Sequence, residues 1–215
     1  MKITISRAAF IAAAATIQAK DDVRYYLKGV LIEKGPDDKP LIVATDGHRM
    51  VAIQDQNGLL PDEMNPVIIS FGPDTLRAAK LVKNLELPVF IEILEPLDAD
   101  GCEKVQVSIG STTTSDSEVI MGSFPEWRRV ASDTKGTAAG WYNSAYVADF
   151  HKIAKYLNRG CPAVTIRSDA PNSSAAVYFG GVDYAFGVIM PMRTDKMVSI
   201  TSLPAWTALP VKKAA

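Results

Sequence analysis

Runs of apolar residues along the chain predict one pattern three times: a strand, a helix, and then three strands. In the first unit, residues 1–6 alternate between polar and apolar, and Ser6 is suited to cap a helix that runs to about residue 20. Strand-like segments follow over 24–33 and 41–53. The expected inward face of this first helix is formed by Phe10, Ala14 and Ile17.

The second unit begins with an apolar strand over 66–71 and continues with a helix of about a dozen residues. Its helix should turn Leu76, Ala79 and Val82 toward the core, and its later strands are expected over 88–94, 105–109 and 112–121. Internal repetition of this kind bears on the whole fold, because each unit offers the same apolar face to its neighbours.

The third unit is predicted to open with a strand-like segment at 140–143, with Ser144 as the helix cap and Gly160 as the C-cap glycine. Val147, Phe150, Ala154 and Leu157 form the inward face of its helix, and its strands are expected over 163–166, 175–179 and 184–190. The pattern as a whole predicts an α+β fold.

The most distinctive stretch is residues 41–53, where two apolar runs are joined through Asp46 and Gly47. Asp-Gly between strand-like runs indicates a hairpin, because glycine accepts positive φ without a Cβ clash. The small polar residues 131–139 read as a linker, and residues 194–215 form a tail without periodicity.

Composition excludes several classes of protein. The chain has 215 residues, a net charge of −1 and only two cysteines, which lie far apart and form no zinc-binding motif. His48 and His151 are the only histidines, and neither has the spacing of a triad or a metal site, so we predict no enzyme, no metal and no cofactor. The alanine-rich run at 8–15 is too short to cross a membrane, and we expect a cytoplasmic protein.

Charge is segregated onto the predicted helices. Residues 6–20, 74–86 and 144–159 carry eight basic and three acidic residues, although the chain as a whole is slightly acidic. Lysine-rich helix faces are common on protein surfaces, but such a face can also follow phosphates without reading bases. The residues that we predict to face DNA, with Arg24 added from outside the helices, are Arg7, Lys20, Arg24, Arg77, Lys80, Lys83, Lys152, Lys155 and Arg159.

Several segments together resemble bacterial DNA polymerase III beta subunits, the sliding clamps. The chain is similar to that family at TDGHR (residues 45–49), DVRYYLKG (22–29), FPEWRRV (124–130), YNSAY (142–146) and VIMPMR (188–193). The segments follow the family's order over most of the chain. The resemblance implies a DNA-clamp fold, a role as a processivity factor in DNA replication, and double-stranded DNA bound without sequence preference.

In that family, these segments build a hydrophobic groove for short peptides of DNA polymerases and the clamp loader. Carried over by position, the resemblance implies a groove made of Thr45, Gly47, His48, Met50, Pro125, Arg129, Val130, Asn143, Tyr146, Val188, Met190, Pro191 and Met192. Methionine side chains suit a surface that serves several partners. Taken singly, each of these residues could equally be ordinary core or turn.

The chain departs from the family in length. It has three units where the family has six, which implies one complete clamp-like domain (1–130), the linker (131–139), one half domain (140–193) and the tail (194–215). A half domain leaves an open sheet edge, so we expect a homo-oligomer in which a second copy completes it. The family's ring of twelve units would then need four chains. The alternative is a clamp-like binding module, or decoy, that captures clamp-binding peptides without encircling DNA.

Overall fold

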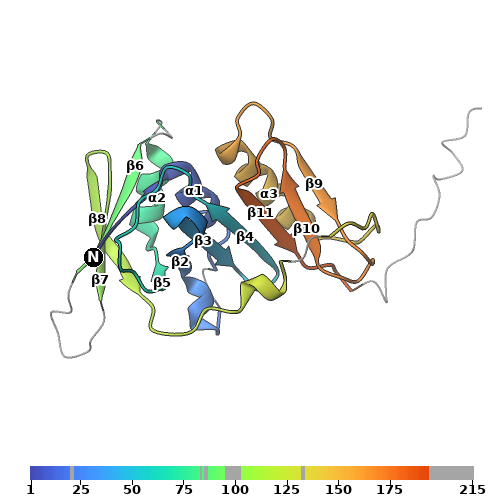
Figure 1. Ribbon diagram of the computed structural model, residues 1–215, viewed down its shortest axis with the longest axis horizontal. Coiled ribbons are helices and arrows are strands. Elements are labelled where there is room, and N and C mark those ends of the chain that lie inside the picture. The colour runs from blue at the N-terminus through green and yellow to red at the C-terminus, as the bar shows by residue number, and fades with distance from the viewer. Residues whose placement is uncertain (20–21, 83, 85–86, 95–102, 132–133, 194–215) are drawn as a thin grey trace, which may run out of the picture.

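The computed structural model describes the chain except residues 20–21, 83, 85–86, 95–102, 132–133 and 194–215. Its strands form one eleven-stranded antiparallel sheet in the order β1-β6-β7-β8-β5-β2-β3-β4-β11-β10-β9. Figure 1 shows the third predicted unit, α3 with β9 to β11, at one end of this sheet and the first two units at the other. The α+β architecture that the apolar pattern predicts is therefore present.

The first unit consists of β1 (Lys2–Ser6), α1 (Arg7–Ala13), β2 (Val30–Lys34), β3 (Pro40–Thr45) and β4 (Arg49–Gln54). Ser6 caps α1 as predicted, its hydroxyl accepting from the Ala9 N–H at 3.3 Å. The expected inward residues Phe10, Ala14 and Ile17 are all buried.

Two boundaries in this unit differ from the prediction. Helix α1 ends at Ala13, because the Thr16 hydroxyl donates to the Ile11 carbonyl at 3.0 Å and the chain closes into turns. The segment 24–33 is not one strand. Its first part is a 3₁₀ helix (Tyr25–Lys28), which follows a turn where the Asp22 carboxylate accepts from the Arg24 N–H at 2.8 Å.

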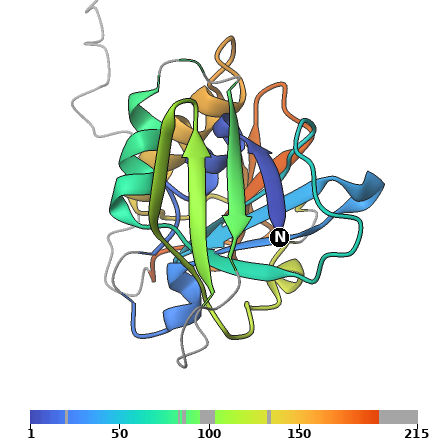
Figure 2. The same cartoon turned by 90° about the vertical axis from the view of Figure 1, so that its left-hand side faces the viewer.

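The second unit consists of β5 (Val67–Ser70), α2 (Pro73–Leu81), β6 (Pro88–Ile93), β7 (Lys104–Ile109) and β8 (Thr112–Val119). The strand predicted to reach residue 121 stops two residues earlier, at Val119. Helix α2 turns Ala79 fully into the core, with Leu76 and Val82 packed against its margin, as its periodicity predicts. Figure 2 shows β8, β7, β6 and β1 on the near side with the helices behind them.

The third unit consists of α3 (Ser144–Leu157), β9 (Val164–Arg167), β10 (Ala175–Phe179) and β11 (Ala185–Ile189). It lacks the leading strand predicted at 140–143, because that segment pairs with no strand. The cap of α3 is Asn143 rather than Ser144, with the Asn143 side chain accepting from the Ala145 N–H at 2.9 Å. Gly160 is not a left-handed cap, since Asn158 ends the helix.

The third unit is joined to the first through sheet and core. Strand β11 pairs antiparallel with β4, with Gly187 opposite Val51. One hydrophobic cluster contains Ile53 of β4 together with Phe150 and Ile153 of α3. The Phe150 ring lies directly against Gly187, where an added Cβ would come within 2.4 Å of it. Only a glycine at this position of β11 leaves room for the ring.

The two shorter 3₁₀ helices lie in connections. One spans Pro36–Asp38 between β2 and β3. The other spans Trp127–Arg129 and places Trp127 against the outer face of the sheet, in a second apolar cluster with Met50 and Val188. This second cluster lies on the side of the sheet opposite the main core, because residues of opposite parity on β4 supply the two.

Candidate functional site

The turn between β3 and β4 is built by its own side chains. The Thr45 hydroxyl donates to the Arg49 carbonyl at 2.8 Å, and the Asp46 carboxylate accepts from the N–H groups of His48 and Arg49, each at 2.9 Å. Gly47 has φ +82°, and a Cβ there would lie 2.6 Å from the guanidinium of Arg24. The left-handed backbone conformation therefore favours glycine at this position.

A cavity of about 320 Å³ opens beside this turn, between β4, β11 and the 3₁₀ helix Trp127–Arg129. Eight of the thirteen residues that the resemblance implied for a groove line it: Thr45, Gly47, His48, Met50, Pro125, Val130, Val188 and Met190. They come from three stretches that are distant in sequence. We call this cavity the groove.

The other five implied residues do not line the groove, and three of them make contacts that the structure describes. Asn143 caps α3, Tyr146 stacks on His48 with ring centroids 6.0 Å apart, and the Met192 N–H donates to the Trp141 carbonyl at 2.7 Å. Arg129 is exposed on its 3₁₀ helix, whereas Pro191 is half-buried next to Met190. Tyr146, which stacks on His48, and Met192, two residues after Met190, thus lie near groove residues without lining the cavity.

Six further residues line the groove although the sequence analysis did not assign them to it: Arg24, Tyr26, Leu27, Arg49, Glu126 and Trp127. All six lie inside the segments that carry the family resemblance, so those segments as wholes were the available signal. Arg24 holds its place through Asp22, whose carboxylate accepts from the guanidinium at 2.8 Å. That hydrogen bond lowers the pKa of Asp22 to about 2.

A charged network ties the groove to α3. The Arg49 guanidinium bonds Asp46 at 3.0 Å and reaches across to Asp149, whose carboxylate also accepts from Lys152 at 2.6 Å. Burial alone raises the pKa of Asp149, but the hydrogen bonds from Lys152 and Arg49 outweigh it and leave that pKa below its ordinary value. The Arg49 guanidinium also lies 4.5 Å from the centre of the Tyr146 ring.

The basic residues of the helices share one face. Helix α1 packs between α2 and α3. One cleft beside the end of α1 is lined by both Lys80 and Lys152, and a neighbouring cleft is lined by both Arg77 and Lys80. Lys155 continues the row on α3 three residues after Lys152, and Arg159 follows just beyond the end of that helix. All five of these side chains are exposed.

Two of the nine residues predicted to face DNA, Arg7 and Arg24, lie elsewhere in the structure. Arg7 is 3% exposed, and its guanidinium donates to the carbonyls of Ala79 (2.7 Å) and Asn84, so its predicted role is wrong. The burial of Arg7 also lowers its pKa. Arg24 lines the groove instead of the helix face. Lys20 and Lys83 lie outside the described residues.

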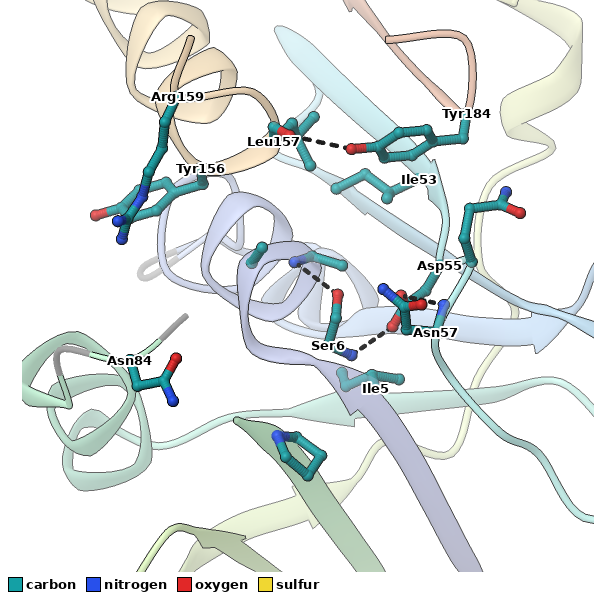
Figure 3. Close-up of a pocket in the computed structure, with 14 residues that line it drawn as sticks. Ile5, Ser6, Ile53, Asp55, Asn57, Asn84, Tyr156, Leu157, Arg159 and Tyr184 are labelled. Atoms are coloured by element: carbon teal, nitrogen blue, oxygen red, sulfur yellow. Dashed lines mark hydrogen bonds between the residues drawn. The ribbon is translucent and has the colours of Figure 1, made fainter. Parts of the chain in front are cut away.

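A larger cavity of about 750 Å³ lies where α1 begins and α3 ends (Figure 3). Asp55 is buried there and accepts from the N–H groups of Ser6 and of Asn57, the latter at 3.2 Å. Tyr184 donates to the Leu157 carbonyl at 3.1 Å, and burial raises its pKa. Because both side chains are hydrogen-bonded to backbone groups of the chain itself, we interpret this cavity as part of the junction between the first and third units.

The described part of the chain has neither a membrane-spanning helix nor a cluster of metal-ligating side chains. No helix there is long and apolar enough to cross a membrane. No group of three or more metal-ligating side chains was found among the same residues. Cys161, one of the two cysteines, is exposed with a free thiol.

The described residues form repeated units whose helices lie against one antiparallel sheet, and a known protein family matches more than half of the chain. Residues 4–126 match the model of the DNA polymerase III beta subunit, central domain. The chain belongs to this family, the bacterial beta sliding clamps. Membership of a family of processivity factors also agrees with the prediction that the chain is not an enzyme.

The relatives show how much of a clamp is present. The chain is 36% identical over 113 residues to the beta sliding clamp of Vibrio cholerae, covering 52% of this chain and 28% of that protein. It is 33% identical over 133 residues to that of Proteus mirabilis, covering 57% and 31%. The DNA polymerase III subunit beta of Pseudomonas aeruginosa superposes with a TM-score of 0.63 at 20% identity, covering 90% of this chain and 66% of that one. The matched sequence therefore covers less than a third of the length of each of these two curated relatives.

Proposed function

We propose that this chain is a shortened sliding clamp, a processivity factor that assembles into a ring around duplex DNA and tethers its partners through the groove. The observation that carries the proposal is the common basic face of α2 and α3, on a fold that belongs to the clamp family. Diffuse lysine contacts to phosphates hold DNA without fixing a register, so a closed ring can slide. Such a role would place the chain in the cytoplasm, where the chromosome is.

Two strand edges that are unpaired in the described part of the chain support assembly, one along the first part of β8 and one along β9. β8 has the position in the second unit that β4 has in the first, and β4 pairs with β11 of the third unit. Thr112–Ser117 of β8 pair only with β7 among the described residues. β9 likewise pairs only with β10 in that part of the chain, and its inward residues Val164 and Ile166 remain half-buried. Unpaired edges of this kind are templates for a second chain.

Each edge can pair with its own copy through a two-fold axis. Alternating β8–β8 and β9–β9 contacts would close a ring from an even number of chains. With three units in each chain, four chains give the twelve units expected of a clamp ring, and the half domain of each chain is completed by the half domain of another. The proposed division into 1–130, 131–139 and 140–193 follows from the same argument.

The first experiment tests encirclement. We expect the purified chain at micromolar concentration to have four times the mass of one chain by light scattering, and to form rings in electron micrographs. Mixed with a circular plasmid during assembly, it should stay bound through a high-salt wash and be released when the plasmid is cut once. A uniform monomer that shows no difference between circular and linear DNA would favour the non-encircling decoy.

The groove would take up a short apolar peptide of a polymerase or clamp loader. The groove has an apolar floor of Met50 and Val188, and Arg24, Arg49 and Glu126 provide charged groups in its lining. A ligand pocket of this kind is largely apolar, with a few polar groups that orient the ligand. Tethering through it would raise the effective concentration of the partner at the primer end.

The second experiment tests the groove with griselimycin, to which a DnaN sliding clamp of Pseudomonas aeruginosa is bound in a solved structure. We expect griselimycin to bind this chain and Met190→Lys to weaken binding at least about tenfold, because a lysine charge would be brought into an apolar site. Met121→Lys is the matched control, since Met121 is 75% exposed and outside the groove. Isothermal titration calorimetry measures both. Equal affinity for the two variants would place griselimycin elsewhere.

A further inference from the structure

The chain continues from the groove directly into an apolar segment. Met190 lines the groove, and residues 194–215 begin four positions later. Residues 197–211 contain no charged side chain and include Leu203, Trp206 and Leu209. A segment that stays in solvent is usually rich in charge and poor in large apolar residues. This composition is that of a ligand for an apolar surface.

We propose that residues 203–209 bind in the groove of their own chain, as a built-in competitor for partner peptides. The proposal rests on the peptide-binding role proposed for the groove, and it names the first ligand of that site. Binding within one chain is favoured because a short tether gives an effective concentration in the millimolar range, which a second copy at micromolar concentration does not reach.

The spacing of the apolar residues suits an extended ligand. Pro204 and Pro210 restrict their neighbours to extended conformations. In a polyproline II segment, which has three residues per turn, residues three apart share one edge. Leu203, Trp206 and Leu209 would therefore point the same way and could enter one groove together.

The connection is long enough. Residues 194–202 separate Arg193 from Leu203. Nine extended residues reach about 30 Å. Since Met190 already contributes to the groove wall, a loop of this length can return the segment to the groove from any side.

The groove also offers a matching polar group. Trp127 lines it and is buried, and its indole N–H has no hydrogen-bond partner among the described residues. A buried donor without an acceptor is costly. An extended peptide carries a row of backbone carbonyls, and one of these would satisfy the indole N–H when the tail is bound.

The test uses the full chain labelled with ¹³C at its methionine methyl groups. Met50 and Met190 line the groove, whereas Met64 and Met121 do not. We expect the substitutions Leu203→Ser, Trp206→Ser and Leu209→Ser, made together, to shift the methyl resonances of Met50 and Met190 and to leave those of Met64 and Met121 in place. Unmoved resonances at Met50 and Met190 would overturn the proposal.

A matched control removes three apolar residues from the connection instead, with Met197→Ser, Val198→Ser and Ile200→Ser. This variant should leave Met50 and Met190 unchanged. The shifts should also persist after about a twentyfold dilution, because a tethered ligand does not dissociate on dilution. Loss of the shifts on dilution would assign the tail to a second copy and overturn binding within the chain.

Griselimycin affinity distinguishes a failure of this proposal from a failure of the proposed function. If the tail fills about nine grooves in ten, its triple substitution should tighten griselimycin binding roughly tenfold. Unchanged affinity, with the methionine resonances also unchanged, would reject the tail while the groove stands. Absence of griselimycin binding to both chains would reject the groove's proposed role, whereas the methionine shifts would still report whether the tail occupies it.

Discussion

Phe150→Ala should destabilise the whole chain by about 3–5 kcal/mol, which is the usual cost of removing a large buried aromatic ring. Phe150 is fully buried on α3, and it packs on Gly187 and at 6.2 Å from the Phe179 ring centre. The mutation therefore removes contacts at the junction between the first and third units.

Whether the variant unfolds in one transition or in two is as informative as the midpoint of unfolding. Because one core contains side chains of all three units, we expect urea unfolding to remain a single transition at a lower midpoint. Circular dichroism follows the helices, including α1, α2 and α3 of the described residues, and tryptophan fluorescence includes the signals of Trp127 and Trp141. Lys155→Ala is the control on the same helix, and as an exposed position it should change stability by less than about 0.5 kcal/mol. Two separate transitions would show that residues 140–193 unfold as an independent half domain.

Reversing three charges on the basic helix face should weaken binding to duplex DNA by roughly a hundredfold at low salt, since binding of this kind depends on phosphate neutralisation. The variant is Lys80→Glu, Lys152→Glu and Lys155→Glu. All three side chains are exposed, and Lys80 and Lys152 line the same cleft. The plot of log affinity against log salt should also lose about 0.9 of slope for each phosphate contact removed.

The matched control reverses three lysines on strands: Lys2→Glu, Lys34→Glu and Lys104→Glu. It changes the net charge by the same amount, so it separates the helix face from the general effect of charge. Fluorescence anisotropy with a labelled duplex, measured over a series of salt concentrations, reads both variants. Equal weakening by the two sets would mean that DNA does not contact the helix face, and the ring proposal would then fail with it.

Asp149 shows why the basic face and the groove are adjacent features. Its carboxylate bonds Lys152 on the helix face and Arg49 in the groove. Asp149 and Arg49 are one hundred residues apart in the chain. The Asp46 carboxylate completes the network by holding Arg49 and the N–H groups of the turn. The orientation of the Arg49 and His48 side chains is thus set partly by the third unit.

The sequence by itself determined the elements that depend on neighbouring residues. The alternation at residues 1–6, the cap at Ser6 and the inward face Phe10, Ala14 and Ile17 follow from local spacing, and the structure has them. The same holds for the turn at Asp46 and Gly47, which its own side chains stabilise. Eight groove-lining residues were found only because whole segments resemble a known family.

The tertiary structure decided what depends on residues far apart in the chain. It buried Arg7 against the Ala79 carbonyl, although helical spacing alone makes that arginine a surface residue. It also paired β11 with β4, which joined the third unit to the first. Long-range pairing and burial are set by the summed packing of all units, and no local window of sequence contains that information.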